Sequence, residues 1–390
     1  MDEKMMDNKK DSGKIREMKP DFYDSFQCTA DQCSMTCCKE WRIEVDGDTY
    51  EEWKSLSLED DKTKLTDSVK LGEDGYGTIK LNKEKKCPFL NKESLCRLVM
   101  KFGDGALSKT CAIFPRETHE FENRTEYTMA TSCPTIVDFL KEREKFSLVG
   151  EREEEDVLFY MRDYMMKLIQ DTRFSISKSF MMAFYVMLEL SDKEKFGIED
   201  IKKYEADEIL SDTSKVIDGM RFFRLNTLEE DNELFLDLAE NYRKEGLYES
   251  YLEPVAQMAE RISEGIDSVN EDEIKAFEER FSAYDGLMRN YLAAEIFHSS
   301  LLPESSLEGM IVMAQWIALE YASIRHAVFL KWLEDGKKEI SYEMVRDYIV
   351  VISRMTGYDE EDIHDYLIGS FESLTWDWGY FALILGNGRM

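Results

Sequence analysis

The chain has 390 residues, and 43% of them are hydrophobic, so it has room for two or three domains and a substantial core. Its formal net charge is −31, of which residues 1–140 contribute only −6. This acidity excludes nucleic-acid binding, because phosphates are bound by clustered Lys and Arg, and it disfavours anionic membranes. A basic or lysine-bearing partner is compatible with it.

The amino-terminal segment is charged throughout, with the sequence MDEKMMDNKKDSGKIREMKP, and it lacks the apolar centre of a signal peptide. No apolar run approaches the roughly 18 residues of a membrane span. We therefore expect a cytoplasmic protein without membrane insertion, in which thiols stay reduced.

The first 145 residues predict short strands and loops. Apolar runs at 41–45 and 77–81 alternate with clusters of Gly, Asp, Asn and Lys. The glycine-rich segment GEDGYGTIK at 72–80 opens no helix, so it indicates a hairpin turn and not a nucleotide-binding loop. We expect a small cysteine-rich domain, α+β or irregular, over residues 1–145.

Residues 146–390 predict an irregular all-helical domain of about eight helices, which makes the whole chain mainly α. The clearest helix covers 306–335, with apolar residues at i+3 and i+4 spacing on more than one face. Ser305 and Glu308 predict its capping box, and Gly336 predicts its end. Similar periodicity covers about 153–170, 177–191, 228–244, 270–297 and 342–354.

All the cysteines lie within the first 133 residues, and they are Cys28, Cys33, Cys37, Cys38, Cys87, Cys96, Cys111 and Cys133. In a cytoplasmic chain, this concentration indicates a metal or iron–sulfur site in preference to disulfides or unligated thiols. The spacing leaves the kind of centre open, because it matches neither the C-x2-C pairs of zinc sites nor the ferredoxin patterns. Neighbouring cysteines such as Cys37 and Cys38 seldom both bind one ion, because successive side chains diverge.

Two segments resemble the flagellin lysine-N-methylase family and, more widely, cysteine-rich domains of the zinc- or iron-chelating type. They read KPDFYDSFQCTADQCSMTCCKEWRIEVDGDTYEEW (19–53) and CPFLNKESLCRLVMKFGDGALSKTCAIFPRETHEFENRTEYTMATSCP (87–134). The order of the cysteines, together with the Phe-Pro-Arg and Ser-Cys-Pro elements, carries the resemblance. It covers the first third of the chain strongly and the rest loosely.

The resemblance implies a protein lysine N-methyltransferase that moves a methyl group from S-adenosylmethionine to the ε-amine of surface lysines on flagellin or another protein. It also implies a [4Fe–4S] cluster, with zinc as the alternative. Its ligands would come from the eight cysteines, with Cys33, Cys37, Cys96 and Cys111 preferred and the other four as alternates. Eight thiols are also enough for two sites.

The chemistry sets further expectations. Lysine is a nucleophile only when neutral, and its unperturbed pKa is about 10.4, so the site must desolvate it or supply a base. A sulfonium donor requires aromatic faces and carboxylates. Since no G-x-G-x-x-G loop follows a strand and opens a helix, the donor pocket has no position in the sequence. We expect any cluster to organise the structure or to clamp the amino-acid end of the donor.

Three features have competing interpretations. Arg116 is the candidate for binding the donor carboxylate, or it forms a structural salt bridge. Trp41 either packs against the cysteine region or shields it. The tail WDWGYF (376–381) docks as a terminal helix, or it cages a cation.

The histidines are scattered, and His326 is expected to be a hydrogen-bonded core residue. Two other classes of protein remain beside the methyltransferase. One is a non-catalytic module, stabilised by zinc or iron, that binds another protein. The other is an electron-transfer protein, which the lack of a second redox-cofactor motif weakens.

Overall fold

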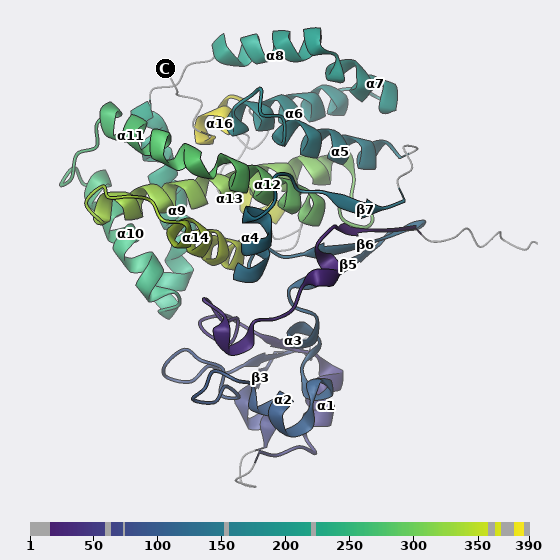
Figure 1. The fold of residues 1–390 in the computed structure, drawn as a ribbon, viewed down its shortest axis with the longest axis vertical. Coiled ribbons are helices and arrows are strands. Elements are labelled where there is room, and N and C mark those ends of the chain that lie inside the picture. The colour runs from purple at the N-terminus through teal and green to yellow at the C-terminus, as the bar shows by residue number, and fades with distance from the viewer. Residues whose placement is uncertain are drawn as a thin grey trace, which may run out of the picture.

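A computed structural model describes residues 16–58, 64–72, 75–151, 156–219, 224–357, 363–367 and 378–385. Figure 1 shows a large helical body above a smaller lobe, which is built from the segments that carry most of the cysteines. The fold is mainly α with a small strand-containing amino-terminal part, as the sequence predicts.

The small lobe contains short elements around its own apolar core. In the described residues it has strands β2 (Glu44–Val45), β3 (Val69–Leu71) and β4 (Gly77–Ile79), in the antiparallel order β2-β4-β3. Its helices are α1 (Gly47–Trp53), α2 (Arg97–Phe102) and α3 (Lys109–Ile113). Trp53 lies in the core and its indole nitrogen donates to the carbonyl of Ala106 at 2.9 Å. The hairpin predicted for 72–80 is confirmed by the pairing of β3 with β4.

A second sheet joins the lobe to the body. In the described part of the chain it contains β1 (Arg16–Pro20), β5 (Arg116–Glu120), β6 (Arg124–Met129) and β7 (Leu148–Gly150), in the order β5-β6-β1-β7. β1 pairs with β6 in parallel and with β7 antiparallel, and β5 with β6 form a hairpin. Because β7 follows residue 145, this sheet crosses the predicted domain boundary, which stays a prediction.

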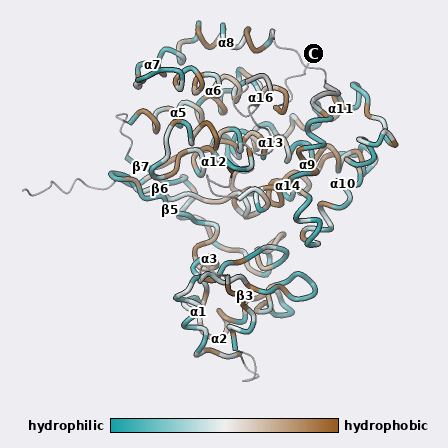
Figure 2. Tube along the Cα trace, turned by 180° about the vertical axis from the view of Figure 1, so that it is seen from behind, coloured by the Kyte–Doolittle hydropathy of each residue, from teal (hydrophilic) through white to brown (hydrophobic). Residues whose placement is uncertain are grey.

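Helices form the body. They are α4 (Pro134–Lys141), α5 (Val157–Ile169), α6 (Ile176–Ser191), α7 (Ile198–Lys202), α8 (Asp207–Gly219), α9 (Arg224–Glu245), α10 (Glu249–Ser263), α11 (Glu271–Phe281), α12 (Asp285–Ser299), α13 (Leu307–Glu334), α14 (Tyr342–Met355) and α16 (Trp378–Ile384). Helix α13 lies at their centre and is buried on nearly every face, because its apolar residues surround the helix. In Figure 2, teal and brown stretches alternate along the outlying α8, as expected for an amphipathic helix.

Three details of the helical prediction are wrong. The cap of α13 is Ser306, whose Oγ accepts from the amide of Gly309 at 3.2 Å, and not Ser305. The periodic stretch 270–297 is two helices, because the chain turns through a 3-10 segment at Ser282–Tyr284. After residue 145, the described residues contain more helices than the eight expected, and they include a strand. Gly336 follows the helix with a φ of 74°, as predicted.

The carboxyl-terminal helix docks into the body. Phe381 of α16 is buried and stacks on Phe184 of α6 with ring centroids 4.0 Å apart. This confirms docking for the described part of the tail, whereas Trp376 and Asp377 lie outside the described residues. Among the described helices, none has the length and apolar character that a membrane crossing requires.

Candidate functional site

One cavity of about 510 Å³ lies between the small lobe and the body, and every cysteine of the chain lines it. Its wall also contains apolar residues, such as Phe26 and Phe89, and two arginines, Arg116 and Arg354. The cysteines come from four separate segments of the chain, which the tertiary structure brings to one place. Their role as ligands stays a prediction.

Short elements of backbone hold these cysteines in position. Cys96 is the residue before α2, and Cys133 stands in the same position before α4, where Pro134 occupies the first helical turn. Cys111 lies in α3, and its amide donates to Oγ of Ser108 at 3.3 Å. The amide of Cys87 donates to the carbonyl of Cys38 at 2.8 Å, which joins two cysteine segments directly.

The cysteines form two groups around the cavity. Four of them belong to the core of the small lobe, and these are Cys38, Cys87, Cys96 and Cys111. Within this group, Cys87 and Cys111 each interact electrostatically with Cys38 and Cys96. On the body side, Cys133 packs in the main core and has Cys33 as its thiol neighbour.

The remaining two cysteines differ from these. Cys37 lies between the groups, because its thiol hydrogen-bonds to Cys38 while it also faces Arg354. Cys28 is exposed at the rim of the cavity.

Burial makes three of the cysteine thiols less acidic. It raises the pKa of Cys87 to about 12, and the pKa of Cys111 and of Cys133 to about 11. In the adjacent pair, the hydrogen bond raises the pKa of Cys37 and lowers that of Cys38. A bound metal would offset the free-energy cost of ionising these buried thiols, since metal coordination favours the thiolate form.

Arg354 of α14 connects the helical body to the cysteine loops. It is buried, and its guanidinium donates to the carbonyls of Ser132 at 3.0 Å, Met35 at 2.8 Å and Thr36 at 3.4 Å. These carbonyls belong to the loops that carry Cys37 and Cys133. No sequence pattern predicts this role of Arg354, because its partners lie more than 200 residues away along the chain.

The preferred set from the sequence, Cys33, Cys37, Cys96 and Cys111, takes members from both groups. The structure instead gathers Cys38 with Cys87, Cys96 and Cys111. Within the described residues, no three His, Cys, Asp or Glu side chains are placed to hold a single metal ion.

Arg116 lines the cysteine cavity, and Trp41 packs beside it. Arg116 lines the cavity, donates to the carbonyl of Phe26 at 3.2 Å and lies over the ring of Tyr23 at 5.3 Å. Its assignment to the donor stays a prediction. Trp41 packs edge-on against Phe114 and lies under the Arg354 guanidinium at 5.1 Å, which is a packing role beside the cavity.

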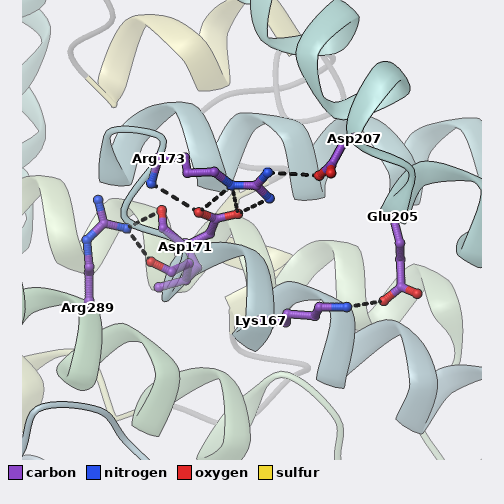
Figure 3. Close-up of polar contacts among 7 residues, drawn as sticks. Lys167, Asp171, Arg173, Glu205, Asp207 and Arg289 are labelled. Atoms are coloured by element: carbon purple, nitrogen blue, oxygen red, sulfur yellow. Dashed lines mark hydrogen bonds and ion pairs between the residues drawn. The ribbon is translucent and has the colours of Figure 1, made fainter.

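A second cavity, of about 610 Å³, lies between β7 and α5. Its aromatic residues include Phe159, Tyr160 and Tyr164, and its carboxylates are Asp163 and Glu205. Lys167 bridges this wall by pairing with Glu205 at 2.9 Å, as Figure 3 shows. The hydroxyl of Tyr160 donates to the same carboxylate at 3.0 Å.

Buried arginine also shapes the end of α5. Arg289 donates to the carbonyls of Ile169 at 2.5 Å, Asp171 at 3.2 Å and Phe174 at 2.6 Å, and Figure 3 shows two of these bonds to the turn. Because these carbonyls lie at the end of α5 and in the turn after it, the guanidinium fixes the turn that leads into α6. The helix that lines the second cavity is thereby held at its carboxyl end.

The histidines are not all isolated, contrary to their scatter along the sequence. His326 is a core residue that hydrogen-bonds to Asn232 at 2.5 Å, as predicted. His119 and His298, however, lie with ring centroids 6.0 Å apart, and Glu117 lies near both. The alternation Glu117-x-His119 on a strand was the signal that sequence reasoning missed, since such residues share one face.

A family model for the C-terminal domain of the FliB lysine N-methylase matches residues 162–384. The chain belongs to the FliB lysine N-methylase family. This confirms the resemblance that the cysteine segments carry, and it does so from a different part of the chain.

Similar proteins include the flagellar biosynthetic protein FliU of Salmonella muenchen, which is 29% identical over 143 residues, 36% of this chain and 85% of FliU. Lysine-N-methylases of Salmonella typhimurium and Salmonella choleraesuis are each 31% identical over 126 residues. The matched stretch covers 31% of this chain and 31% of each of those two proteins. No solved structure matches the chain.

Proposed function

We propose that this member of the FliB family is a protein lysine N-methyltransferase that uses S-adenosylmethionine and carries an iron–sulfur cluster. The observation that carries the proposal is the single cavity lined by every cysteine, in a chain of this family. Flagellin, or another protein with exposed lysines, is the proposed substrate.

We propose an iron–sulfur cluster in preference to a single zinc ion. In a [4Fe–4S] cluster each thiolate binds a different iron, so the ligand sulfurs lie farther apart than they do around one ion. Cys38, Cys87, Cys96 and Cys111 share one core and line one cavity, which brings four thiols from three segments of the chain together. We therefore propose these four as the ligands.

The surroundings of the group suit a negatively charged centre. Arg354 lies beside Cys37 and Cys38 and favours their ionised forms. Apolar walls exclude water, and a guanidinium in such a place interacts strongly with an anionic site. A bound cluster would cross-link the lobe segments and place a redox-active centre at the junction with the helical body.

We propose that the donor binds in the second cavity. Its volume of about 610 Å³ falls within the range of about 300–1,000 Å³ that is usual for small-molecule sites. Phe159, Tyr160 and Tyr164 provide aromatic faces for a sulfonium, and Asp163 provides a carboxylate. Glu205 is paired with Lys167, and Arg124 and Lys145 of the same wall could bind the carboxylate of the donor. Rigid placement of the donor is what direct methyl transfer to an amine mainly requires.

Two measurements test the proposal together. Anaerobically purified protein should contain iron and sulfide, with a broad absorption band near roughly 400 nm that dithionite bleaches. It should also transfer labelled methyl groups from S-adenosylmethionine to lysines of flagellin. Colourless protein with stoichiometric zinc and no transfer would support the non-catalytic interaction module instead.

Variants locate the two sites. Cys87→Ser and Cys96→Ser should abolish the absorption band, whereas Cys28→Ser, at the exposed rim, should retain it. Tyr164→Leu should weaken binding of S-adenosylhomocysteine about fivefold, since stacked aromatic contacts contribute on the order of 1 kcal/mol. If Cys28→Ser bleaches the protein while Cys87→Ser does not, the proposed ligand set is wrong.

A further inference from the structure

Strand β5 is an edge strand whose outer side is open. Among the described residues it pairs with β6 alone, and its residues Glu117, Thr118 and Glu120 are exposed. An exposed edge offers unpaired amide and carbonyl groups, so an extended segment of another protein can add to the sheet there.

One face of β5 carries a carboxylate between two imidazoles. Glu117 and His119 share this face because they are two residues apart on a strand. His298, near the end of α12, meets them. Oε2 of Glu117 lies 3.8 Å from Nε2 of His298 and 3.9 Å from Nε2 of His119.

The polar atoms of this cluster are only partly satisfied. Nδ1 of His298 bonds to Oγ1 of Thr128 at 2.8 Å, so its Nε2 is the nitrogen that faces Glu117. His119 is 9% exposed, and its buried Nδ1 has no hydrogen-bond partner. The Glu117 side chain is 51% exposed, which leaves the cluster open to solvent on the carboxylate side.

Charge at this position favours a cation. The pKa of Glu117 is lowered to about 2, chiefly by the positive charge that His298 has when it is protonated, so this carboxylate is ionised throughout the working pH range. A proton acceptor must be neutral, and with both imidazoles neutral Glu117 is the charged group of the three. Glu295 of α12 lies near it, but burial raises the pKa of Glu295 to about 7, so it adds only part of a negative charge near neutral pH. On β6, Glu126 is paired with Arg124 and with Arg162 of α5, so that ion-pair cluster has a net positive charge and the attraction for a cation rests on Glu117.

The strand also runs between the two cavities. Its first residue, Arg116, lines the cysteine cavity, and Phe121, just after its end, contacts Phe159 of the second cavity with ring centroids 5.0 Å apart. A segment added to the start of β5 would therefore lie beside the cysteine cavity, while the far end of the strand contacts the wall of the second cavity through Phe121.

We propose that the β5 edge receives an extended lysine-bearing segment of the protein substrate, with Glu117 binding its ε-ammonium and His298 accepting a proton from it. This inference rests on the proposed function and supplies the base that lysine methylation needs. The occupant is a lysine segment because the open side of the cluster presents a carboxylate, and because the surface of the chain is acidic overall.

The proposed step balances. An N–H bond of the ammonium breaks, its proton goes to Nε2 of His298, and the electron pair stays on the lysine nitrogen. That pair forms the bond to the methyl carbon of a sulfonium donor, and the carbon–sulfur bond breaks to leave a neutral thioether. The imidazolium then returns its proton to water.

Binding is measured first, without donor, so that catalysis is not needed. A short fluorescein-labelled peptide with one central lysine is titrated with the full-length protein, and fluorescence anisotropy gives Kd. Glu117→Gln should weaken binding about tenfold, because it removes a charge-assisted hydrogen bond. Glu120→Gln is the matched control, since it removes the same charge from the opposite face of the strand and should change Kd less than about twofold.

A second probe does not depend on any variant. The same peptide with norleucine in place of lysine should bind wild-type protein about tenfold more weakly. Equal binding of the two peptides, or equal effects of the two glutamate substitutions, would overturn the docking proposal.

The proton acceptor is tested by the pH profile of methyl transfer. His298→Asn retains an amide that can bond to Thr128 but removes Nε2, so kcat should fall about 100-fold near neutral pH with little change in KM. The deficit should shrink as the pH approaches about 10.4, where lysine loses its proton unaided. A loss that is the same at every pH would show that His298 is not the base.

The outcomes separate this inference from the proposed function. If wild-type protein transfers no methyl group, the proposed function fails, while the peptide titrations still decide the docking surface. If transfer occurs but neither Glu117→Gln nor His298→Asn behaves as stated, only the inference about β5 fails.

Discussion

At the scale of single residues, Glu320 is the most unusual group in the helical body. It is buried on α13 and accepts hydrogen bonds from Tyr291, Ser353 and Thr356. Burial raises its pKa to about 7, and Glu295 nearby is raised to about 7 for the same reason. Both carboxyls therefore bind protons more tightly in the folded protein than in the unfolded chain.

This gives stability a defined dependence on pH. Where the folded state binds more protons, the free energy of unfolding falls as pH rises, here between about pH 4.5 and about pH 7. A shift of this size corresponds to roughly 3 kcal/mol for Glu320. Glu320→Gln removes this titrating carboxyl. The free energy of unfolding of the variant should therefore rise relative to that of wild type as the pH increases from about 4.5 to about 7.

Urea unfolding at several pH values measures the effect. His326, whose pKa is lowered to about 3, contributes the opposite slope, but it does so in both proteins, so the difference between the two curves isolates Glu320. Parallel curves would mean that the folded carboxyl titrates at its ordinary pKa.

At the scale of elements, two features position α13: the capping residue at its start and the apolar residues on its faces. Its sequence is apolar on several sides, which places it at the centre of the body, and Ser306 satisfies an amide at its start. The apolar face fixes where the helix packs, whereas the cap fixes where it begins.

Ser306→Ala should lower the free energy of unfolding by about 1 kcal/mol, because the amide of Gly309 loses its acceptor. Ser306→Asp should retain most of the stability, since aspartate is also a good cap and complements the helix dipole. Denaturant unfolding of the two variants checks this. Equal losses would assign the effect to packing of Ser306 and not to its hydrogen bond.

At the scale of the whole molecule, the lobe and the body meet at the cysteine cavity. Arg354 enters from α14 and bonds the loops of the amino-terminal part, while Arg42 and Lys85 of the lobe contact Glu245 at the end of α9. The family match begins only at residue 162, so the matched helices supply Arg354 to loops that lie outside the match.

Arg354→Met should therefore disturb the cysteine cavity from a distance along the chain. It leaves the carbonyls of Met35, Thr36 and Ser132 without their donor, and we expect a loss of about 3 kcal/mol in unfolding free energy. Cys133 and Cys37 should also react faster with a thiol reagent, as alkylation followed by mass spectrometry would show.

Arg243→Met is the matched control for this prediction. Arg243 pairs with Glu253 and Glu260, and the ion pairs it makes are only part-buried. Its loss should cost less than about 1 kcal/mol and leave the thiol reactivity unchanged. Equal thiol reactivity in Arg354→Met and wild type would show that Arg354 does not order the cysteine loops.

Apolar periodicity and capping residues predicted the ends of a helix correctly where those ends depend on that helix alone. The periodicity at 177–191 and 342–354 predicts α6 and α14 to within a residue or so, and the glycine at 336 marks the end of α13. It failed where two local choices compete, as between Ser305 and Ser306, or where a short turn divides one periodic run at Ser282–Tyr284.

By itself, the sequence determined the helical class, because apolar spacing acts over short distances, and it indicated the family through the order of the cysteines and the short elements beside them. Only the tertiary structure decided that Cys38 groups with Cys87, Cys96 and Cys111, that Arg354 bonds the cysteine loops, and that Glu117 meets His298. These contacts depend on how separate helices and strands pack against one another. Packing is determined by the shapes of whole helix and sheet faces, which the spacing of residues within one element does not predict.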